Sequence, residues 1–511
     1  MNASDTATQD APGRAGEARK ALYLAAAVAV FVLIELLPLG RLAVGDTPLN
    51  HAGHAVIALF FLAIVLWVSE ALPFAVTGLI VLLLLPLLGV TDGAPPVAGS
   101  VAPSRDVAEG FAQVVGIGFG SPIVLFTFGL MLLSAAVSRS GLGRRAVVLA
   151  LAKTRATRRG VVLVFMALGA VLGMWFTAVV GAAMMAPIVR SVVGAVEEHP
   201  AAPAEQRALR IALAIACGWG PLLGGMATPA GALANLLAIE YFHQLAHIDI
   251  TFGQWMAVGV PVAALLIPAG WLVLMRFYDP GAGRPDFTAM AARLPAVSAA
   301  ERKTLAVFLL TAAAWLAAPV LNQLTGLALS TYWIALAGGL SLFLPGMNIA
   351  GWHESLREVD WNTLLLLASG LALGRFTYST GAAGWLAGLI MQHVVALTPF
   401  LQAVAVLSAV AALKLLFNST TITGVVVSPL LIHFSLTHHI DPLRLTLPAA
   451  VASSLGLILI TQSLTNVIAY STGYLSMRDM ILPGLIGSVI AVPVIAAVTL
   501  AVLPWLQVVR F

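Results

Sequence analysis

Apolar segments separated by short polar ones recur along almost the whole chain, from Ala21 to Val509. Many of these segments approach the roughly 20 residues that a helix needs to cross a bilayer. Several others are too short to cross alone, which predicts re-entrant hairpins and helices that break within the membrane. The pattern therefore predicts an all-α polytopic membrane protein.

Two bent, polar stretches stand at matching places in the two halves of the chain, at Met174–Pro187 and Phe417–Pro429. A backbone break at membrane depth is tolerated only where it is buried in protein or lines a wet cavity. Paired breaks of this kind are typical of the binding site of a secondary transporter. We expect a helical hairpin in each half, with its tip near Thr177 in the first and near Ser419 in the second.

A second pair of breaks follows the hairpins. In the first half, Gly224–Gly231 contains three glycines and a proline, and such a run does not continue a regular helix. In the second half, Thr461–Asn466 lacks both residue types but is densely polar within apolar sequence. We expect both segments to unwind near the middle of the membrane; the alternative is a kink whose hydroxyls bond to their own backbone.

Three landmarks recur in the same order in both halves. Gly141 and Gly381 are 240 positions apart, Thr177 and Ser419 are 242 apart, and Asn235 and Asn466 are 231 apart. Lysine and arginine crowd the loops after Gly141, which marks that side as cytoplasmic, whereas neither occurs between Phe376 and Leu413. The two copies are therefore expected to face opposite ways, as inverted repeats do in secondary transporters.

These features divide the chain into five parts. The expected division is 1–20 as a disordered cytoplasmic tail, 21–120 as N-terminal scaffold helices, 121–275 as the first repeat, 276–303 as a basic cytoplasmic connector and 304–511 as the second, inverted repeat. The apolar run Ala21–Gly40 follows Arg19 and Lys20 and is too long for a typical signal peptide, so we expect it to be a retained first span.

Composition excludes an ordinary soluble domain. Hydrophobic residues make up 60% of the chain and charged residues only 9%, against about a quarter charged in soluble domains. The single cysteine excludes internal disulfides, and the net charge of +4 reflects basic loops and gives no reason to expect a nucleic-acid partner. We find no cluster of metal-ligating side chains and no Ser/His/Asp set, so we expect neither an enzyme nor a resident cofactor.

Helix ends at the tips and breaks leave unpaired N–H and C=O groups, which can bind anionic oxygens and cations respectively. The substrate-binding candidates are Thr177, Ala178, Val179, Thr228, Pro229, Ser419, Thr420, Thr421, Thr465 and Asn466. The candidates for binding a cation are Thr177, Gly224, Gly225, Asn235, Ser419 and Thr461. The alternative is that these small and hydroxyl residues pack one helix against another.

Lys414 lies about one turn before the second tip, with no acidic residue near it in the sequence. An intramembrane lysine is costly and is by default a functional candidate. We expect its ammonium to compensate the charge of a bound anion, in place of a sodium ion. Alternatively it supports proton coupling, extends to an interface, or pairs with Glu70 or Glu35.

Several motifs resemble the divalent anion/sodium symporter family. They are Ser69-Glu70-Ala71-Leu72-Pro73, the flanks Met174-Trp175 and Ala182-Ala183-Met184-Met185-Ala186-Pro187 of the first tip, the Gly224–Gly231 run leading to Asn235, and Asp360-Trp361-Asn362-Thr363. The resemblance covers about Leu66 to Leu503. It implies a scaffold domain that dimerises, a mobile domain with two hairpins, elevator-type movement, and transport of a dicarboxylate, tricarboxylate or sulfate across the cytoplasmic membrane with Na⁺ as coupling ion.

The tips depart from that family's pattern. Where the family has Ser-Asn-Thr, this chain has Thr177-Ala178-Val179 and Ser419-Thr420-Thr421, with Asn418 just before the second tip. In the family these tips contact substrate carboxylates and help to ligate sodium. The loss of side-chain oxygens leaves three interpretations open: a sodium-coupled carrier, a sodium-independent exchanger or proton-coupled carrier, and a protein that keeps the fold without transport.

Overall fold

The computed structural model describes residues 14–39, 49–90, 107–154, 156–197, 202–327, 329–347, 349, 351–391, 394–417 and 419–508. The regular elements in these ranges are all helices, and nine of the helices are long and apolar enough to cross a membrane. The chain is thus an all-α, multi-pass membrane protein, as predicted. Asn418 lies outside the described residues.

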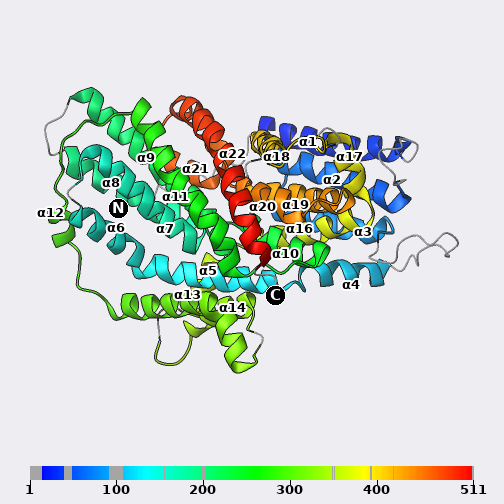
Figure 1. Cartoon of the computed structure of the whole chain (residues 1–511), viewed down its shortest axis with the longest axis horizontal. Coiled ribbons are helices and arrows are strands. Elements are labelled where there is room, and N and C mark those ends of the chain that lie inside the picture. The colour runs from blue at the N-terminus through cyan, green and yellow to red at the C-terminus, as the bar shows by residue number, and fades with distance from the viewer. Residues whose placement is uncertain are drawn as a thin grey trace.

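The helices fall into two series that follow one another along the chain (Figure 1). Before and within the first repeat they are α1 (Arg14–Leu36), α2 (His51–Ser69), α3 (Phe74–Leu87), α4 (Val107–Gly118), α5 (Pro122–Ser140), α6 (Leu142–Lys153), α7 (Arg158–Phe176), α8 (Ala178–Glu197), α9 (Pro203–Gly225), the 3₁₀ turn η2 (Pro229–Gly231), α10 (Leu233–Ala246) and α11 (Phe252–Phe277). The second series contains α12 (Thr288–Ala292), α13 (Ala299–Thr325), α14 (Thr331–Ser341), α15 (Trp352–Glu358), α16 (Trp361–Ser379), α17 (Ala382–Met391), α18 (Pro399–Leu413), α19 (Thr420–Thr437), α20 (Pro442–Ala452), the 3₁₀ turn η3 (Ile460–Gln462), α21 (Leu464–Tyr470) and α22 (Met477–Val508).

Helices α5 to α11 correspond one by one to α16 to α22. The first pair ends alike, because Gly141 and Gly381 adopt left-handed φ angles of 78° and 80° at the turns into α6 and α17. Glycine adopts this conformation without a steric penalty. The counterpart of α5 is therefore α16, which begins at Trp361. Three helices, α13 to α15, precede α16, just as α2 to α4 precede α5.

Ion pairs and hydrogen bonds show that α5 and α16 run in opposite directions. Arg139, near the end of α5, pairs with Glu354 at 3.1 Å and Glu358 at 2.7 Å on α15, which leads into α16. At the other end, the residue before α5 and the last part of α16 are both hydrogen-bonded to α10. The end of α5 therefore lies near the beginning of α16, and the repeats are inverted.

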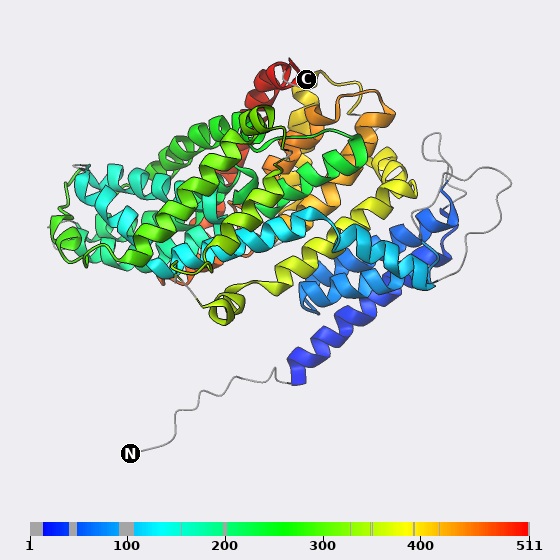
Figure 2. The same ribbon diagram turned by 90° about the horizontal axis from the view of Figure 1, so that it is seen from below.

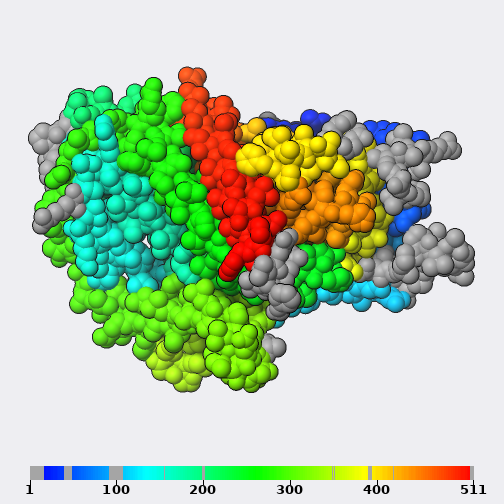
Figure 3. Space-filling view, viewed as in Figure 1, coloured from blue at the N-terminus to red at the C-terminus, as the bar shows by residue number. Residues whose placement is uncertain are grey.

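The two repeats also interlock. Helix α3 packs on α16 and α14 packs on α5, so each repeat's first helix is covered by a helix from the other half. Likewise α10 packs on α19 and α20, while α21 packs on α8 and α9. The α5–α14 contact needs glycine, because a Cβ at Gly129 would lie 2.6 Å from the carbonyl oxygen of Ala335. Figure 3 shows α22 crossing one face between the cyan and green first repeat and the yellow and orange second.

The basic connector folds against the basic loops of the first repeat. The backbone N–H of Arg158 donates to the carbonyl of Gly283 at 2.7 Å, and Arg145 pairs with Glu301 at 2.8 Å. Arg159 donates to Asp279 at 2.7 Å, which holds the pKa of that carboxyl below its usual value. The two most basic segments thus share one face, as the prediction that both are cytoplasmic requires; the side of the membrane on which they lie stays a prediction.

The N-terminal segment differs from its prediction. Helix α1 begins at Arg14, so 14–20, which we assigned to a disordered tail, are helical; residues 1–13 lie outside the described part. The helix forms because Arg14–Leu36 contains neither proline nor a run of β-branched residues. It packs along α2 at the edge of the molecule (Figure 2).

Candidate functional site

The first tip is a sharp reversal between two antiparallel helices. Helix α7 ends at Phe176, Thr177 adopts φ 71° and ψ 147°, and α8 starts at Ala178. A positive φ is a strained conformation for a β-branched residue and is common at functional sites. Close packing of α7 on α9 fixes the tip, since a Cβ at Gly173 would lie 2.2 Å from the carbonyl oxygen of Pro221.

The first break lies directly beside this tip. Helix α9 ends at Gly225, the chain passes through η2, and α10 begins at Leu233. The Nδ2 of Asn235 donates to the carbonyls of Gly225 at 2.9 Å and Thr228 at 2.8 Å. The Thr228 hydroxyl donates to the carbonyl of Met174, at the end of α7, at 2.5 Å. One side chain therefore holds the break open, and another ties it to the tip.

The second tip has a different polar composition. Helix α18 ends at Leu413, Lys414 follows, and α19 begins after Ser419, whose hydroxyl accepts a hydrogen bond from the N–H of Ile422 at 3.5 Å. Ser419 has φ −123°, so it does not share the positive φ of Thr177. A serine in this position is a normal N-cap.

The second break unwinds, although the sequence there contains no proline or glycine within Thr461–Asn466. Helix α20 ends at Ala452, and an irregular segment and η3 separate it from α21. The Nδ2 of Asn466 donates to the carbonyls of Gly456 at 2.6 Å and Leu459 at 3.1 Å. The Oε1 of Gln462 accepts from the N–H of Ile458 at 2.8 Å and that of Leu459 at 2.9 Å. Side chains thus replace the helical bonds that the break removes.

The two breaks are equivalent position by position. The same offset of 231 relates Asn235 to Asn466 and both of their carbonyl partners, and it relates η2 to η3. Each asparagine is completely buried, and the Oδ1 of each has no hydrogen-bond partner in the described part of the chain. We call this arrangement, an asparagine donating to two carbonyls of a broken helix, the asparagine clamp.

Lys414 joins the second tip to the second break. Its side chain is completely buried, and Nζ donates to the carbonyl of Gln462 at 3.0 Å. It forms no ion pair with any residue that the structure describes, so the alternatives of pairing with Glu70 or Glu35 do not hold, nor does extension to an interface. A buried ammonium with one neutral acceptor leaves donors and a positive charge for an anion.

The predicted candidates differ in accessibility. Thr177, Ala178, Ser419 and Thr420 are half-buried, Val179 and Thr461 are exposed, and the remainder are buried, namely Gly224, Gly225, Thr228, Pro229, Asn235, Thr421, Thr465 and Asn466. The Thr228 and Asn235 side chains donate within the first repeat, and the Thr465 hydroxyl bonds to that of Ser463 at 2.9 Å. Their roles in binding a solute stay predictions.

Contacts between the repeats bring each break close to the other half. A Cβ at Gly424 on α19 would lie 3.1 Å from the Cα of Ala234, next to the first clamp. A Cβ at Gly218 on α9 would lie 2.9 Å from the Oδ1 of Asn466. Each hairpin is therefore tied to its own break by a side chain, and each break contacts helices of the other repeat.

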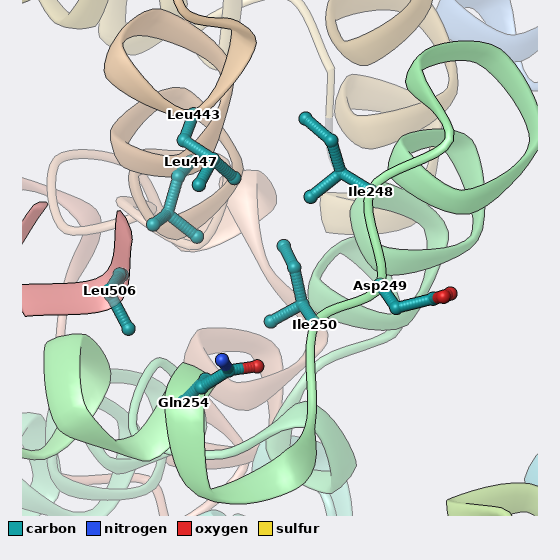
Figure 4. Close-up of a pocket in the computed structure, with 7 residues that line it drawn as sticks. All are labelled: Ile248, Asp249, Ile250, Gln254, Leu443, Leu447 and Leu506. Carbon is teal, nitrogen blue, oxygen red and sulfur yellow. The ribbon is translucent and has the colours of Figure 1, made fainter. Parts of the chain in front are cut away.

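A separate small pocket opens away from both tips, between the α10–α11 loop and helices α20 and α22 (Figure 4). Its lining is mostly aliphatic, and the Asp249 carboxylate turns away from it toward His243, at 2.7 Å. Burial of a small anion needs several converging polar groups. This cavity is not the anion site that the tips and breaks indicate.

Two inverted repeats, each with a re-entrant hairpin and a broken helix, define the class as membrane transporters. The chain belongs to the sodium:sulfate symporter family, whose profile for the transmembrane region matches residues 18–509. It is a multi-pass protein of the cytoplasmic membrane and a transport protein rather than an enzyme.

Individual relatives agree with this assignment. A sodium-dependent dicarboxylate transporter of Staphylococcus saprophyticus is 26% identical over 478 residues, which cover 89% of this chain and 87% of the relative. A transporter of the same name from Staphylococcus aureus is 25% identical, with 86% and 84% covered. The solved structure of the Alcanivorax borkumensis YdaH transporter resembles the fold with a TM-score of 0.55 at 15% identity, over 85% of this chain and 99% of that one.

Proposed function

We propose that this protein is a secondary active carrier for a small dianion of the dicarboxylate or sulfate class, which binds between the two hairpin tips. Support comes from the family and from relatives named as sodium-dependent dicarboxylate transporters. The observation that carries the proposal is the buried Lys414 ammonium at the second tip. The N-termini of α8 and α19 begin at the tips, where the helix dipole favours an anion.

In this proposal the two tips contribute different charges. Lys414 supplies its ammonium in the second repeat, where it occupies a backbone carbonyl that a metal cation could otherwise bind. The first repeat has no lysine at its tip, so the neutral oxygens of its break, such as the unpartnered Oδ1 of Asn235, have no ammonium beside them in the described part of the chain. If the protein binds sodium, we therefore expect the ion at the first break and not at the second.

Transport in this proposal follows the elevator type: the helices that carry the hairpins and breaks move against α5, α14 and α16. The family resemblance also implies a homodimer. A sodium-independent exchanger is the second candidate. If the Lys414 ammonium alone balances the charge of the anion between the tips, no metal cation is needed.

The test is uptake into proteoliposomes of sulfate, succinate, citrate and tartrate, each with and without a sodium gradient. We expect one dianion to accumulate and to be recovered chemically unaltered. Uptake driven by sodium favours the coupled carrier, and counterflow without sodium favours the exchanger. Failure of all four anions to move, in protein that melts cooperatively, would contradict both.

A further inference from the structure

Helix α10 carries a buried carboxylate near its middle. Glu240 is 2% exposed and receives three hydrogen bonds. The Ser121 hydroxyl and the Gln244 Nε2 donate to Oε1 at 2.8 and 2.7 Å, and the Tyr332 hydroxyl donates to Oε2 at 2.9 Å. The network lies apart from both tips and is not used by the proposed anion site.

Most of these contacts join α10 to another group of helices. Ser121 is the N-cap residue of α5, and Tyr332 lies in the first turn of α14, which packs tightly along α5. Two further bonds reach α16: the Tyr241 hydroxyl donates to the carbonyl of Gly370 at 2.7 Å, and Arg375 donates to that of Gln244 at 3.0 Å. These bonds must part if α10 moves against α5, α14 and α16.

Glu240 forms no ion pair with any described residue, although it is surrounded by elements that carry titratable groups. On or beside α10 these are Tyr241, His243, His247 and Asp249; on the packed helices they are Tyr332 on α14, Arg139 at the far end of α5, Arg375 and Tyr378 on α16, His433 and His438 on α19, and Asp441 and Arg444 on α20. The carboxylate is held by neutral donors alone. An intramembrane carboxylate of this kind is costly unless it is bonded or neutralised.

Two of the three partners can accept as well as donate. A hydroxyl is both donor and acceptor, whereas an amide nitrogen only donates. A proton added to Oε2 would allow Glu240 to donate to the Tyr332 oxygen, after rotation of that hydroxyl, while Gln244 continues to donate to Oε1. These partners can therefore hydrogen-bond Glu240 both as a carboxylate and as a carboxylic acid. The only atom transferred is one proton, from water to the carboxylate.

We propose that Glu240 is the site where this carrier takes up a proton, and that proton uptake accompanies the separation of α10 from α5 and α14. The inference rests on the proposed function, in which α10 moves with the hairpins. When α10 moves away from α5 and α14, the Glu240 carboxylate loses the donors Ser121 and Tyr332. An unpaired buried charge is unfavourable, so protonation of the carboxylate becomes favourable. A proton that binds one conformation better than the other shifts the equilibrium toward it, so a pH gradient can drive transport.

The first experiment uses proteoliposomes that contain a pH-sensitive dye, with the membrane potential clamped at zero and succinate, or whichever dianion moves, outside. In the wild type, inward dianion movement should carry protons, and a gradient of one pH unit should raise accumulation by a factor of about ten per coupled proton. E240Q should lose both effects. The matched control is E354Q, because the Glu354 side chain is 62% exposed and lies on α15, away from this network.

A second measurement needs no substrate. The melting temperature of the purified protein in detergent should depend on pH, and E240Q should weaken that dependence while E354Q keeps the wild-type profile. Y332F, which keeps the carboxylate but removes one donor, should shift the pH at which the change occurs. Dianion uptake with identical proton movement in the wild type and E240Q would overturn the inference and leave the proposed function intact. Loss of the pH-dependent melting in E240Q, without uptake of any anion by the wild type, would support the proton site and refute the transport proposal.

Discussion

The two junctions between tip and break differ in chemistry although their backbones match. In the first repeat a neutral hydroxyl of the break, Thr228, donates to a carbonyl of the hairpin, Met174. In the second repeat the direction is reversed, and a charged group of the hairpin, Lys414, donates to a carbonyl of the break, Gln462. Both junctions keep an asparagine clamp with the same spacing.

This difference separates what the fold requires from what the solute requires. A broken helix in the membrane must satisfy its freed carbonyls, and the same asparagine solution serves both halves. Nothing in the fold requires a lysine in one half only. The asymmetric charge is therefore the feature to associate with the anion, and the symmetric clamp is the feature to associate with stability.

Substitution of the lysine should have the largest effect. K414M removes the ammonium and keeps a flexible apolar side chain of similar length, so anion uptake should fall by about 100-fold, on the order of 3 kcal/mol for one charge-assisted contact. The measurement is the initial rate of dianion uptake in proteoliposomes.

K153M is the control for Lys414, because Lys153 is an exposed lysine at the end of α6. It should transport like the wild type. Wild-type uptake by K414M would show that the asymmetric charge has no role in binding, and the second junction would then be purely structural.

Removal of either clamp should destabilise the protein by similar amounts. N235A and N466A each remove two hydrogen bonds to backbone carbonyls of the break, at a cost of about 2–4 kcal/mol. The melting temperatures of the two variants in detergent should fall together. N322A, which instead removes two hydrogen bonds between a half-buried amide and Leu329, tests whether the loss of an asparagine's bonds elsewhere has this effect. A large drop for one clamp and none for the other would break the equivalence of the halves.

Loss of the neutral junction should have a smaller effect. T228V removes the hydroxyl that donates to Met174 and accepts from the N–H of Gly231, at a cost of about 1–2 kcal/mol. T228S keeps the hydroxyl and should restore the wild-type melting temperature. If T228S is as unstable as T228V, the methyl packing of Thr228 and not its hydrogen bond holds the first tip to its break.

The sequence was sufficient to predict most of the fold because its strongest signals are local. Three glycines and a proline within Gly224–Gly231 indicate a break whatever surrounds them, and the spacing from Asn235 to Asn466 indicated a repeat. The second break was harder to predict, because no residue within Thr461–Asn466 excludes a helix. It unwinds through the side chains of Gln462 and Asn466, whose acceptors and donors become evident only in three dimensions.

The residues that the sequence did not reveal depend on distant partners. Glu240 is one carboxylate in an apolar helix, and its partners Ser121 and Tyr332 are 119 and 92 positions away. A carboxylate within an apolar helix is itself a signal of function in the sequence. Lys414 was predicted as a functional residue, but Glu70 and Glu35 were the partners considered for it, because nothing in the sequence places Gln462 beside it.

Substitution of the two tip residues by glycine should change the stability of the protein in opposite directions. This is the smallest of the expected differences between the repeats. Thr177 has φ 71°, which is unfavourable for a β-branched residue, so T177G should stabilise the protein by about 0.5–1 kcal/mol even after the loss of a weak bond to the N–H of Val180 at 3.4 Å. Ser419 has φ −123° and caps α19, so S419G should destabilise it by a few tenths of a kcal/mol. Melting curves of both variants, measured beside the wild type, give the two signs. Equal shifts in one direction would mean that the strain at Thr177 is absent in the membrane, and that the first tip is as relaxed as the second.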